Sequence, residues 1–353
     1  MPRAELQKFT QMPSKTESTP SASEHAPWRA TVRKYQRSNL KRSSWQLVNT
    51  MGGLLLLWIA MVFVAKISLW LVLPLAVLTG GFLVRIFIIF HDCTHNSFFR
   101  SRRANTFWGT VTGVLCFTPY HHWKWEHSVH HAHSGDLDSR GMGDVWTMTV
   151  DEYLKASSFT KLRYRINRNP VFLFLIAPPL LFILLHRISA KGASARAVRS
   201  VHFTTLAILL FGGAVAWTIG WAPYLVMQFT SMYVASVAGV WLFYIQHQFE
   251  GVTWERNEEW DFAEAAINGS SFYRLPKILQ WFSGNIGFHH MHHLSPGIPN
   301  YHLEECHSEN SFFQTAPTIG LRDSLKSFEY RLWDEESRRL VGFKHLRKIS
   351  PPA

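Results

Sequence analysis

The sequence predicts an all-α integral membrane protein with four transmembrane helices in two hairpins. Short re-entrant or interfacial helices and a cytoplasmic helical cap, holding a histidine-ligated two-metal site, complete the predicted fold. Two observations lead to this prediction. Four apolar runs, at residues 47–65, 68–90, 202–220 and 223–243, each approach or exceed the ~20 residues that a helix needs to cross a bilayer. Three clusters of histidine lie beside these runs.

The first two apolar runs are predicted to form an antiparallel hairpin. Only Lys66 and Ile67 separate them, so the chain must reverse direction at once. The second run ends directly before His91. His91 and the basic N-terminal segment are therefore expected on the same side of the membrane.

The last two runs are predicted to form a second hairpin. Their turn at Trp221 and Ala222 contains no Lys or Arg, which favours an external position, because basic residues are kept on the cytoplasmic side. The other ends of these helices are then internal. His247 follows the last run by about one helical turn, again on the inner side.

Two further apolar stretches are predicted not to cross the membrane. The stretch at residues 107–120 is too short to cross a bilayer and contains glycine. The stretch at residues 171–185 is also short and is interrupted by Pro178 and Pro179. Basic residues flank the second stretch at both ends, which is typical of a re-entrant or interfacial segment. A fifth crossing there would place the third histidine cluster on the opposite side from the other two.

The polar ends of the chain complete the predicted organisation. We expect a disordered basic cytoplasmic tail at residues 1–44, a membrane domain at residues 45–310 and a cytoplasmic C-terminal tail at residues 311–353. Residues 1–43 contain nine Lys and Arg against three acids, and the net charge of the chain is +12. We interpret this positive charge as a sign that the basic segments lie on the cytoplasmic side, next to the anionic inner surface of the membrane. No nucleic-acid partner is expected, because no nucleic-acid-binding motif accompanies the charge.

The histidine clusters have the spacing of metal ligands. His91 and His95 are four residues apart, and the pattern His-x-x-His-His occurs at residues 127–131 and 289–293. Residues three or four apart share a helical face, whereas adjacent residues diverge by about 100°, so each adjacent pair is suited to two different metals. Imidazole is a good ligand for iron, zinc or copper, and a structural zinc site needs only four ligands. The predicted catalytic ligands are His91, His95, His127, His130, His131, His289, His292 and His293, with His247 as a further metal ligand.

Carboxylates near these clusters are expected to orient the rings through the second ring nitrogen. The sequence does not decide which of them do so. Arg85, within the second apolar run, is costly to bury and should point toward the site or the membrane interface. The available carboxylates are Asp92, Glu126, Asp136, Asp138, Asp144 and Glu250.

Three motifs surround the clusters: HDCTHNSFF, WEHSVHHAH and GNIGFHHMHHLSPGIPNY. Together they resemble the membrane fatty acid desaturases, most closely the bacterial acyl-lipid desaturases of the delta-12 and delta-5 type. The likeness runs from about residue 81 to residue 307. It implies that the two metals are iron, and that His247 is the ligand that follows the last membrane helix. Asn96 stands where plant relatives have another histidine, so its contribution is left open.

The resemblance also implies a reaction. Two non-haem irons with O2 as co-substrate would introduce a cis double bond into a lipid-linked fatty acyl chain. An external donor, with ferredoxin favoured, would supply electrons, because no His-Pro-Gly-Gly haem motif is present. The expected location is a bacterial inner membrane, with the active site and both termini cytoplasmic.

Two alternative functions stay open from the sequence. A hydroxylase of the same superfamily, acting on carotenoid, sphingolipid or alkane, would use the same ligands. The continuation Leu-Ser-Pro-x-Ile-Pro-x-Tyr after the third cluster favours desaturation. A haem-binding electron-transfer protein would need only one or two axial histidines per haem, and does not predict two His-x-x-His-His repeats.

Overall fold

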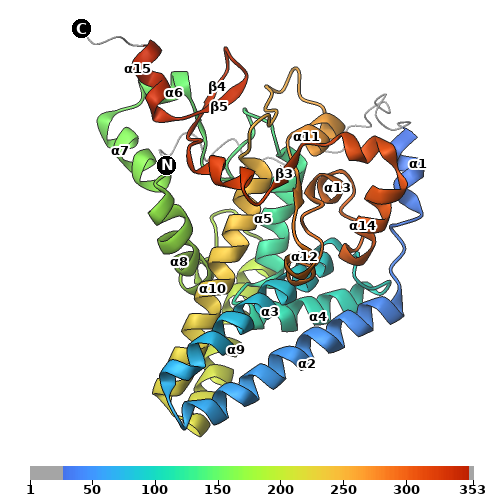
Figure 1. Cartoon of the computed structure of the whole chain (residues 1–353), viewed down its shortest axis with the longest axis vertical. Helices are drawn as coiled ribbons and strands as arrows, with labels where there is room; N and C mark the ends of the chain where they lie inside the picture. Colours follow the sequence, from blue (N-terminus) through green and yellow to red (C-terminus); the bar gives the residue numbers. More distant parts are fainter. Residues whose placement is uncertain (1–26, 350–353) are drawn as a thin grey trace.

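The four predicted apolar runs all form long helices in the computed structural model, which describes residues 27–349 (Figure 1). Each is long and apolar enough to cross a membrane. At the ends nearer the histidines they continue beyond the apolar runs, because backbone hydrogen bonding in a helix does not stop where the side chains become polar. The four helices are α2 (Leu40–Ala65), α3 (Leu69–His95), α9 (Ala195–Ile219) and α10 (Trp221–His247).

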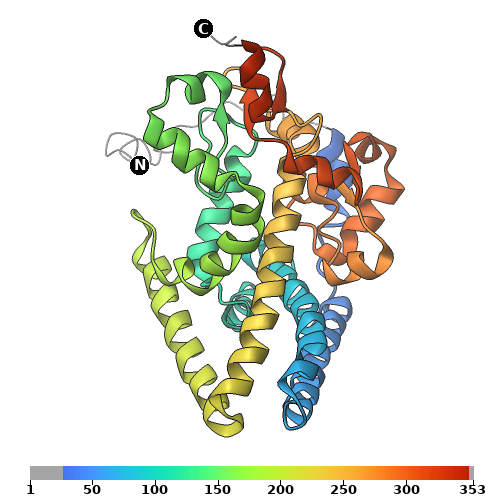
Figure 2. The same cartoon turned by 60° about the vertical axis from the view of Figure 1, so that its left-hand side comes forward.

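The turns between consecutive long helices lie at one end of the molecule (Figure 2). Three residues separate α2 from α3, and Ser68 caps α3 by accepting a hydrogen bond from the backbone N–H of Trp70. Gly220 alone separates α9 from α10. The ends of α3 and α10 that carry histidine lie toward the opposite end of the molecule.

Helix α3 is the central long helix. It packs against α2, α10 and α4 (Arg102–Leu115), and 56% of its most apolar window is buried, against 17–22% in the other three. A Cβ added at Gly80 would lie 2.7 Å from the side chain of Val234 on α10, so glycine permits this close approach. The outer faces of α2 and α9 expose large apolar side chains such as Leu56 and Phe211. Such continuous apolar exposure fits contact with lipid.

Shorter elements lie above and beside the long helices. The expected interruption at Pro178 and Pro179 is wrong: a π-helical turn (Phe172–Ile176) runs directly into α8 (Ala177–Ile183), whose first turn accommodates both prolines. The bend lies earlier, before Phe172, where the segment turns by 59° relative to α7 (Ser158–Asn167). The remaining α-helices are α1 (Pro27–Arg33), α5 (Tyr120–His133), α6 (Val150–Lys155), α11 (Phe262–Asn268), α12 (Lys277–Phe282), α13 (His289–Leu294), α14 (Asn300–Glu309) and α15 (Leu346–Ile349).

The expectation of disorder throughout residues 1–44 is wrong for the part that the structure describes. Residues 27–33 form α1, and α2 begins at Leu40. Val32 and Tyr35 are buried against α13 and α14, and the Tyr35 hydroxyl donates to Glu309. The polar average composition of this segment hid an apolar helical face. It is formed by Trp28, Val32 and Tyr35, whose spacings of four and three residues place them on the same side of a helix. Residues 1–26 of the predicted tail lie outside the described residues.

The described residues are mostly helical, but the all-α expectation overlooked the five short strands that they contain. Strands β1 (Met148–Thr149) and β4 (Leu332–Asp334) pair in parallel, and β4 pairs with β5 (Arg339–Val341) in antiparallel. A second sheet pairs β2 (Phe272–Arg274) with β3 (Thr318–Gly320) in parallel. Strands of two or three residues are too short to show an alternating pattern in sequence.

Residues 311–349 are a packed part of the body and not a tail. Trp333, Leu340 and Ile319 are buried in a cluster that includes Tyr244 near the end of α10. The Tyr244 hydroxyl lies 3.2 Å from the carbonyl oxygens of Ser327 and Tyr330. The few large apolar side chains of this segment are hidden in sequence by its polar average composition. In the structure they cover the end of α10.

Candidate metal centre

Four helices bring the predicted histidines together. His91 and His95 occupy the last turns of α3, and His247 is the last residue of α10. The second cluster lies on α5 and the third on α13. In α3, α5 and α13 the spacing of three or four turns the rings toward one interior region, and the single histidine of α10 meets them at the end of its helix.

The first group of rings contains five imidazoles from three helices. One ring nitrogen from each lies within 4.8 Å of one from every other member. Ring centroids are 4.3 Å apart for His91 and His292, and 4.8 Å apart for His95 and His131. The members are His91, His95, His127, His131 and His292.

The second group adjoins the first. His130, His247 and His293 meet the same 4.8 Å limit. His289 joins them, with its Nε2 2.9 Å from Nε2 of His247 and 3.1 Å from Nε2 of His293. In both His-x-x-His-His repeats the adjacent pair is divided, because His131 and His292 belong to the first group while His130 and His293 belong to the second.

The nitrogen positions fit bound metal ions better than a hydrogen-bonded histidine core. His131 Nε2 lies 3.0 Å from His127 Nε2 and 2.9 Å from His292 Nε2. Two nitrogens about 2.1 Å from a shared ion and about 90° apart lie about 3.0 Å from each other. His95 Nε2 and His130 Nε2 are buried without any hydrogen-bond partner, and such orphan atoms are costly unless something binds them.

Burial also keeps the imidazoles in the form that binds metal. It lowers the pKa of His127, His131 and His292 well below the ordinary range, and the neighbouring imidazoles lower it further. Burial likewise lowers the pKa of His289 and His293. These rings are neutral near pH 7, and neutral imidazole has a free lone pair for a metal. All-nitrogen ligands in two adjoining groups suit two ions of iron, zinc or copper.

Comparison with known proteins decides the family. The family model for fatty acid desaturases matches residues 68–319, which include all nine predicted histidine ligands. The chain belongs to the fatty acid desaturase family. A "Fatty acid desaturase" of Bacillus subtilis (strain 168) is 44% identical over 318 residues, covering 90% of each chain.

More distant relatives of this desaturase carry more specific names. The "sn-1 acyl-lipid omega-3 desaturase (ferredoxin)" of Synechocystis sp. is 27% identical over 253 residues, or 69% of this chain and 68% of that protein. The "sn-1 oleoyl-lipid 12-desaturase" of Picosynechococcus sp. is 26% identical over 253 residues, or 68% of this chain and 69% of that protein. The family resemblance seen in the histidine motifs is thereby confirmed.

Asp144 supports the second group of histidines in this desaturase. Its Oδ1 lies 2.6 Å from His130 Nδ1, and its Oδ2 accepts the backbone N–H of Gly141. Gly143 has φ +79°, and a Cβ there would lie 2.9 Å from the Cβ of His130. Glycine thus lets this loop close over the ring. The sequence offered Asp144 among six carboxylates and could not single it out, because only the loop's path brings it to His130.

Asp92 joins the first and third clusters. Its Oδ2 accepts hydrogen bonds from the backbone N–H of Asn300, at 2.7 Å, and from the side-chain amide of Asn300, at 2.8 Å. Gln46 of α2 donates to the Asn300 amide oxygen at 3.0 Å. Asp92 Oδ1 is 3.5 Å from His91 Nδ1, beyond ordinary hydrogen-bond length. Asp92 therefore acts mainly on Asn300, a residue that the sequence analysis had not selected.

Within the described part of the chain, two other residues that the sequence placed next to the ligands, Asn96 and Glu126, form no side-chain hydrogen bond with either histidine group. Asn96 is exposed and ends α3 in the left-handed conformation, with φ 58°. Glu126 Oε2 lies 3.2 Å from Nδ1 of His122, which belongs to neither histidine group. Arg85 donates to Thr50 and to the carbonyl oxygen of Trp281, and so ties α3 to α2 and α12. Several other histidines close in sequence to the three clusters belong to neither group, namely His121, His122, His133, His290, His302 and His307.

Aromatic rings enclose part of the centre. The Trp123 ring stacks on His127 with centroids 4.2 Å apart, and Phe243 contacts both His130 and His247. These rings limit the access of water to the imidazoles.

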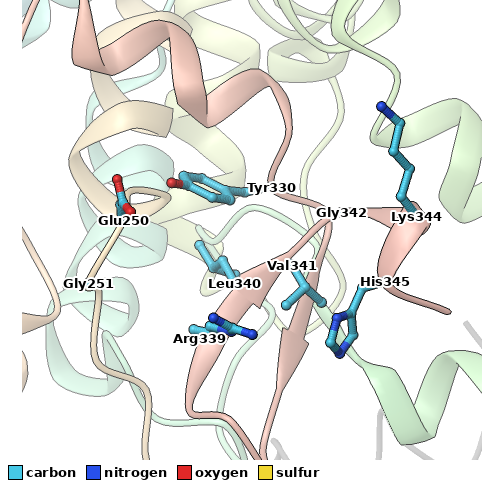
Figure 3. Close-up of a pocket in the computed structure, with 9 residues that line it drawn as sticks. All are labelled: Glu250, Gly251, Tyr330, Arg339, Leu340, Val341, Gly342, Lys344 and His345. Carbon is cyan, nitrogen blue, oxygen red and sulfur yellow. The ribbon is translucent and has the colours of Figure 1, made fainter. Parts of the chain in front are cut away.

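An open cavity lies away from the histidine centre, between the turn after α10 and the segment around β5 (Figure 3). Its volume is about 340 Å³, and its lining includes Glu250, Tyr330, Arg339 and His345. None of the nine predicted ligands lines it.

Proposed function

We propose that this desaturase is an O2-dependent di-iron enzyme that introduces a cis double bond into a lipid-linked fatty acyl chain. The observation that carries the proposal is the meeting of nine imidazoles in two adjoining groups, each suited to one ion. The proposed ligands are His91, His95, His127, His131 and His292 in one group, and His130, His247, His289 and His293 in the other. When bound, the irons would supply the activation of O2 that removal of hydrogen from an unactivated methylene requires.

The residues of the chain would hold and shield this chemistry. The buried imidazoles stay neutral and so retain lone pairs for the metals, Asp144 fixes the ring of His130, and Trp123 and Phe243 restrict water. In the overall reaction the acyl chain loses two hydrogen atoms, that is two protons and two electrons, and a donor supplies two more electrons. With two protons from solvent, O2 leaves as two waters.

We further propose a lipid substrate and a ferredoxin-like donor. Support comes from the names of the relatives, which include an oleoyl-lipid desaturase and an acyl-lipid desaturase whose name specifies ferredoxin. An acidic donor would suit the net charge of +12. The same names favour desaturation over hydroxylation of carotenoid, sphingolipid or alkane.

We propose that α2 with α3, and α9 with α10, cross a bacterial inner membrane as two hairpins. The histidine centre, the cap and both termini would then be cytoplasmic, with residues 45–310 as the catalytic membrane domain. Residues 171–185 would enter the membrane surface without crossing. The position of both inter-helix turns at one end of the molecule supports this arrangement (Figure 2).

The proposed reaction is tested by analysing membrane lipids from a bacterial host that expresses the chain. Mass spectrometry with double-bond location should find a new unsaturated acyl chain, at one position, in cells with the native chain. The His292→Ala variant should reach the membrane in equal amount and give none. New hydroxylated lipid without a new double bond would instead establish the hydroxylase alternative.

A further inference from the structure

A cluster of cations lies where α4, α5 and α9 pack together. It comprises Arg102 at the start of α4, Lys124 in α5 and Arg196 at the start of α9. Arg196 Nε donates to Nε2 of His121 at 3.2 Å, which fixes the guanidinium against α5. A second bond, from the backbone N–H of His122 to the Ser200 hydroxyl, holds α5 against α9.

This cation cluster has no carboxylate partner. Within residues 27–349, no ion pair joins Arg102, Lys124 or Arg196 to Asp or Glu, and the only side-chain hydrogen bond of Arg196 goes to the neutral ring of His121. Partial burial, and then the charges of Arg196 and Arg102, lower the pKa of Lys124 from its ordinary value. Lys124 is therefore a partly buried cation between two exposed arginines, Arg102 and Arg196, and a bound anion would relieve the repulsion that these arginines exert on it.

The surroundings indicate which kind of anion. Exposed apolar side chains follow the cations on the same helices, with Phe107 60% exposed on α4 and Phe203 55% exposed on α9. Helix α9 is also one of the four candidate membrane helices. Cations directly beside an apolar surface of this kind match the boundary between lipid phosphates and acyl chains.

We propose that Arg102, Lys124 and Arg196 form a binding site for the phosphate group of an anionic glycerophospholipid. A choline or ethanolamine headgroup carries a cation that this cluster would repel, so phosphatidylglycerol should bind in preference. Lys124 lies one helical turn before His127 on α5. A lipid held there would fix the helix that carries three of the proposed ligands at the membrane surface. The inference concerns lipid binding and holds whatever reaction the histidine centre performs.

Short-chain lipids test the proposal on purified, delipidated full-length protein. Tryptophan fluorescence would follow titration with dioctanoyl phosphatidylglycerol and, separately, dioctanoyl phosphatidylcholine. We expect phosphatidylglycerol to bind with a dissociation constant at least about tenfold lower. Combining Arg102→Gln, Lys124→Gln and Arg196→Gln should abolish that preference and leave the metal content unchanged. Equal binding of the two lipids by the native protein would overturn the proposal.

A matched variant separates a defined site from diffuse surface charge. Arg322→Gln, Lys344→Gln and Arg347→Gln together remove the same charge from the C-terminal segment, and should leave the preference intact. An equal loss in both triple variants would refute a defined site. If the cluster variant does not fold, Arg196→Gln alone, with Arg196→Lys as its charge-retaining partner, makes the same comparison. Displacement of the lipid by millimolar inorganic phosphate alone would identify a soluble phosphate compound and reject the lipid.

Discussion

At the scale of single residues, the carboxylates around the histidines determine how firmly each ring is held. Asp144 contacts His130 directly, at 2.6 Å, whereas Asp92 acts on Asn300 and through it on the chain that follows α13. Ring-orienting carboxylates of this kind commonly change metal affinity by about 10- to 100-fold when they are replaced. The two acids should therefore have separable effects, one on metal retention and one on stability.

Replacing Asp144 with Asn should weaken one metal position. The amide keeps the size of the side chain but removes the charge that orients His130, so the second histidine group should lose its ion about 10 to 100 times more readily. Elemental analysis after mild chelation should show about one iron per chain where the native protein keeps two. Asp138→Asn, at an exposed carboxylate paired with Arg256, is the control. Equal retention by both variants would contradict the role of Asp144.

Replacing Asn300 with Ala should lower the stability of the whole protein. The change removes the side-chain amide that donates to the buried Asp92 carboxylate and leaves only the backbone N–H of residue 300 as its donor, and a hydrogen bond to a charged group contributes about 1.5–3 kcal/mol. Because this one side-chain hydrogen bond is lost, we expect the free energy of unfolding to fall by about 2 kcal/mol. Thermal unfolding in detergent measures it. Asn268→Ala, where the amide pairs with exposed Glu264, should change the midpoint little, and an equal shift there would argue against the Asp92 contact.

At the scale of elements, the close approach of α3 and α10 fixes two of the ligand-bearing helix ends. Gly80 on α3 faces Val234 so closely that a Cβ would meet it at 2.7 Å. Gly80→Leu should therefore force the two helices apart. Overpacking of this kind lowers the free energy of unfolding by about 1–3 kcal/mol. Gly239→Leu is the matched change on α10, where a Cβ meets nothing within 4 Å. Folded yield and metal content should fall for Gly80→Leu alone, and similar yields would show that the contact is unimportant.

The sequence predicted long elements well and short ones poorly. Runs of about 20 apolar residues leave few alternatives to a helix in a membrane, so α2, α3, α9 and α10 were expected. The placing of Val32 and Trp333 in the interior could not be derived in the same way, because each belongs to a polar segment whose partner is far along the chain. Likewise the nine histidines were expected together, but the pairing of Asp144 with His130 depends on the path of a loop.

At the scale of the whole molecule, the C-terminal segment acts as structural cover. Trp333 is 2% exposed and packs beside Tyr244 and Trp254. Trp333→Ala should cost about 3–5 kcal/mol, as for other large buried side chains. Trp217→Ala removes a ring that is 84% exposed on α9 and serves as the control. If the two variants unfold at the same temperature in detergent, residues 311–349 are dispensable for stability.

The number of membrane crossings is the other property of the whole molecule that can be tested. Between residues 27 and 349, four helices are long enough to cross, and the bent segment of α7 and residues 172–187 would make five if it crossed as well. Cys93, Cys116 and Cys306 are buried, so single cysteines introduced at exposed sites can be labelled selectively. The informative sites are Ile67, between α2 and α3, Thr218, near the turn between α9 and α10, and Ser308 on α14.

With four crossings, a membrane-impermeant maleimide should label Ile67→Cys and Thr218→Cys in intact cells, and Ser308→Cys only after permeabilisation. A crossing by the bent segment would place Ile67 and Thr218 on opposite sides, and would leave α3 and α10 presenting their histidines to different compartments. The nine imidazoles meet in one centre, which is compatible only with an even number of crossings between residues 95 and 247. Labelling of just one of Ile67 and Thr218 in intact cells would therefore contradict both the topology and the shared metal centre.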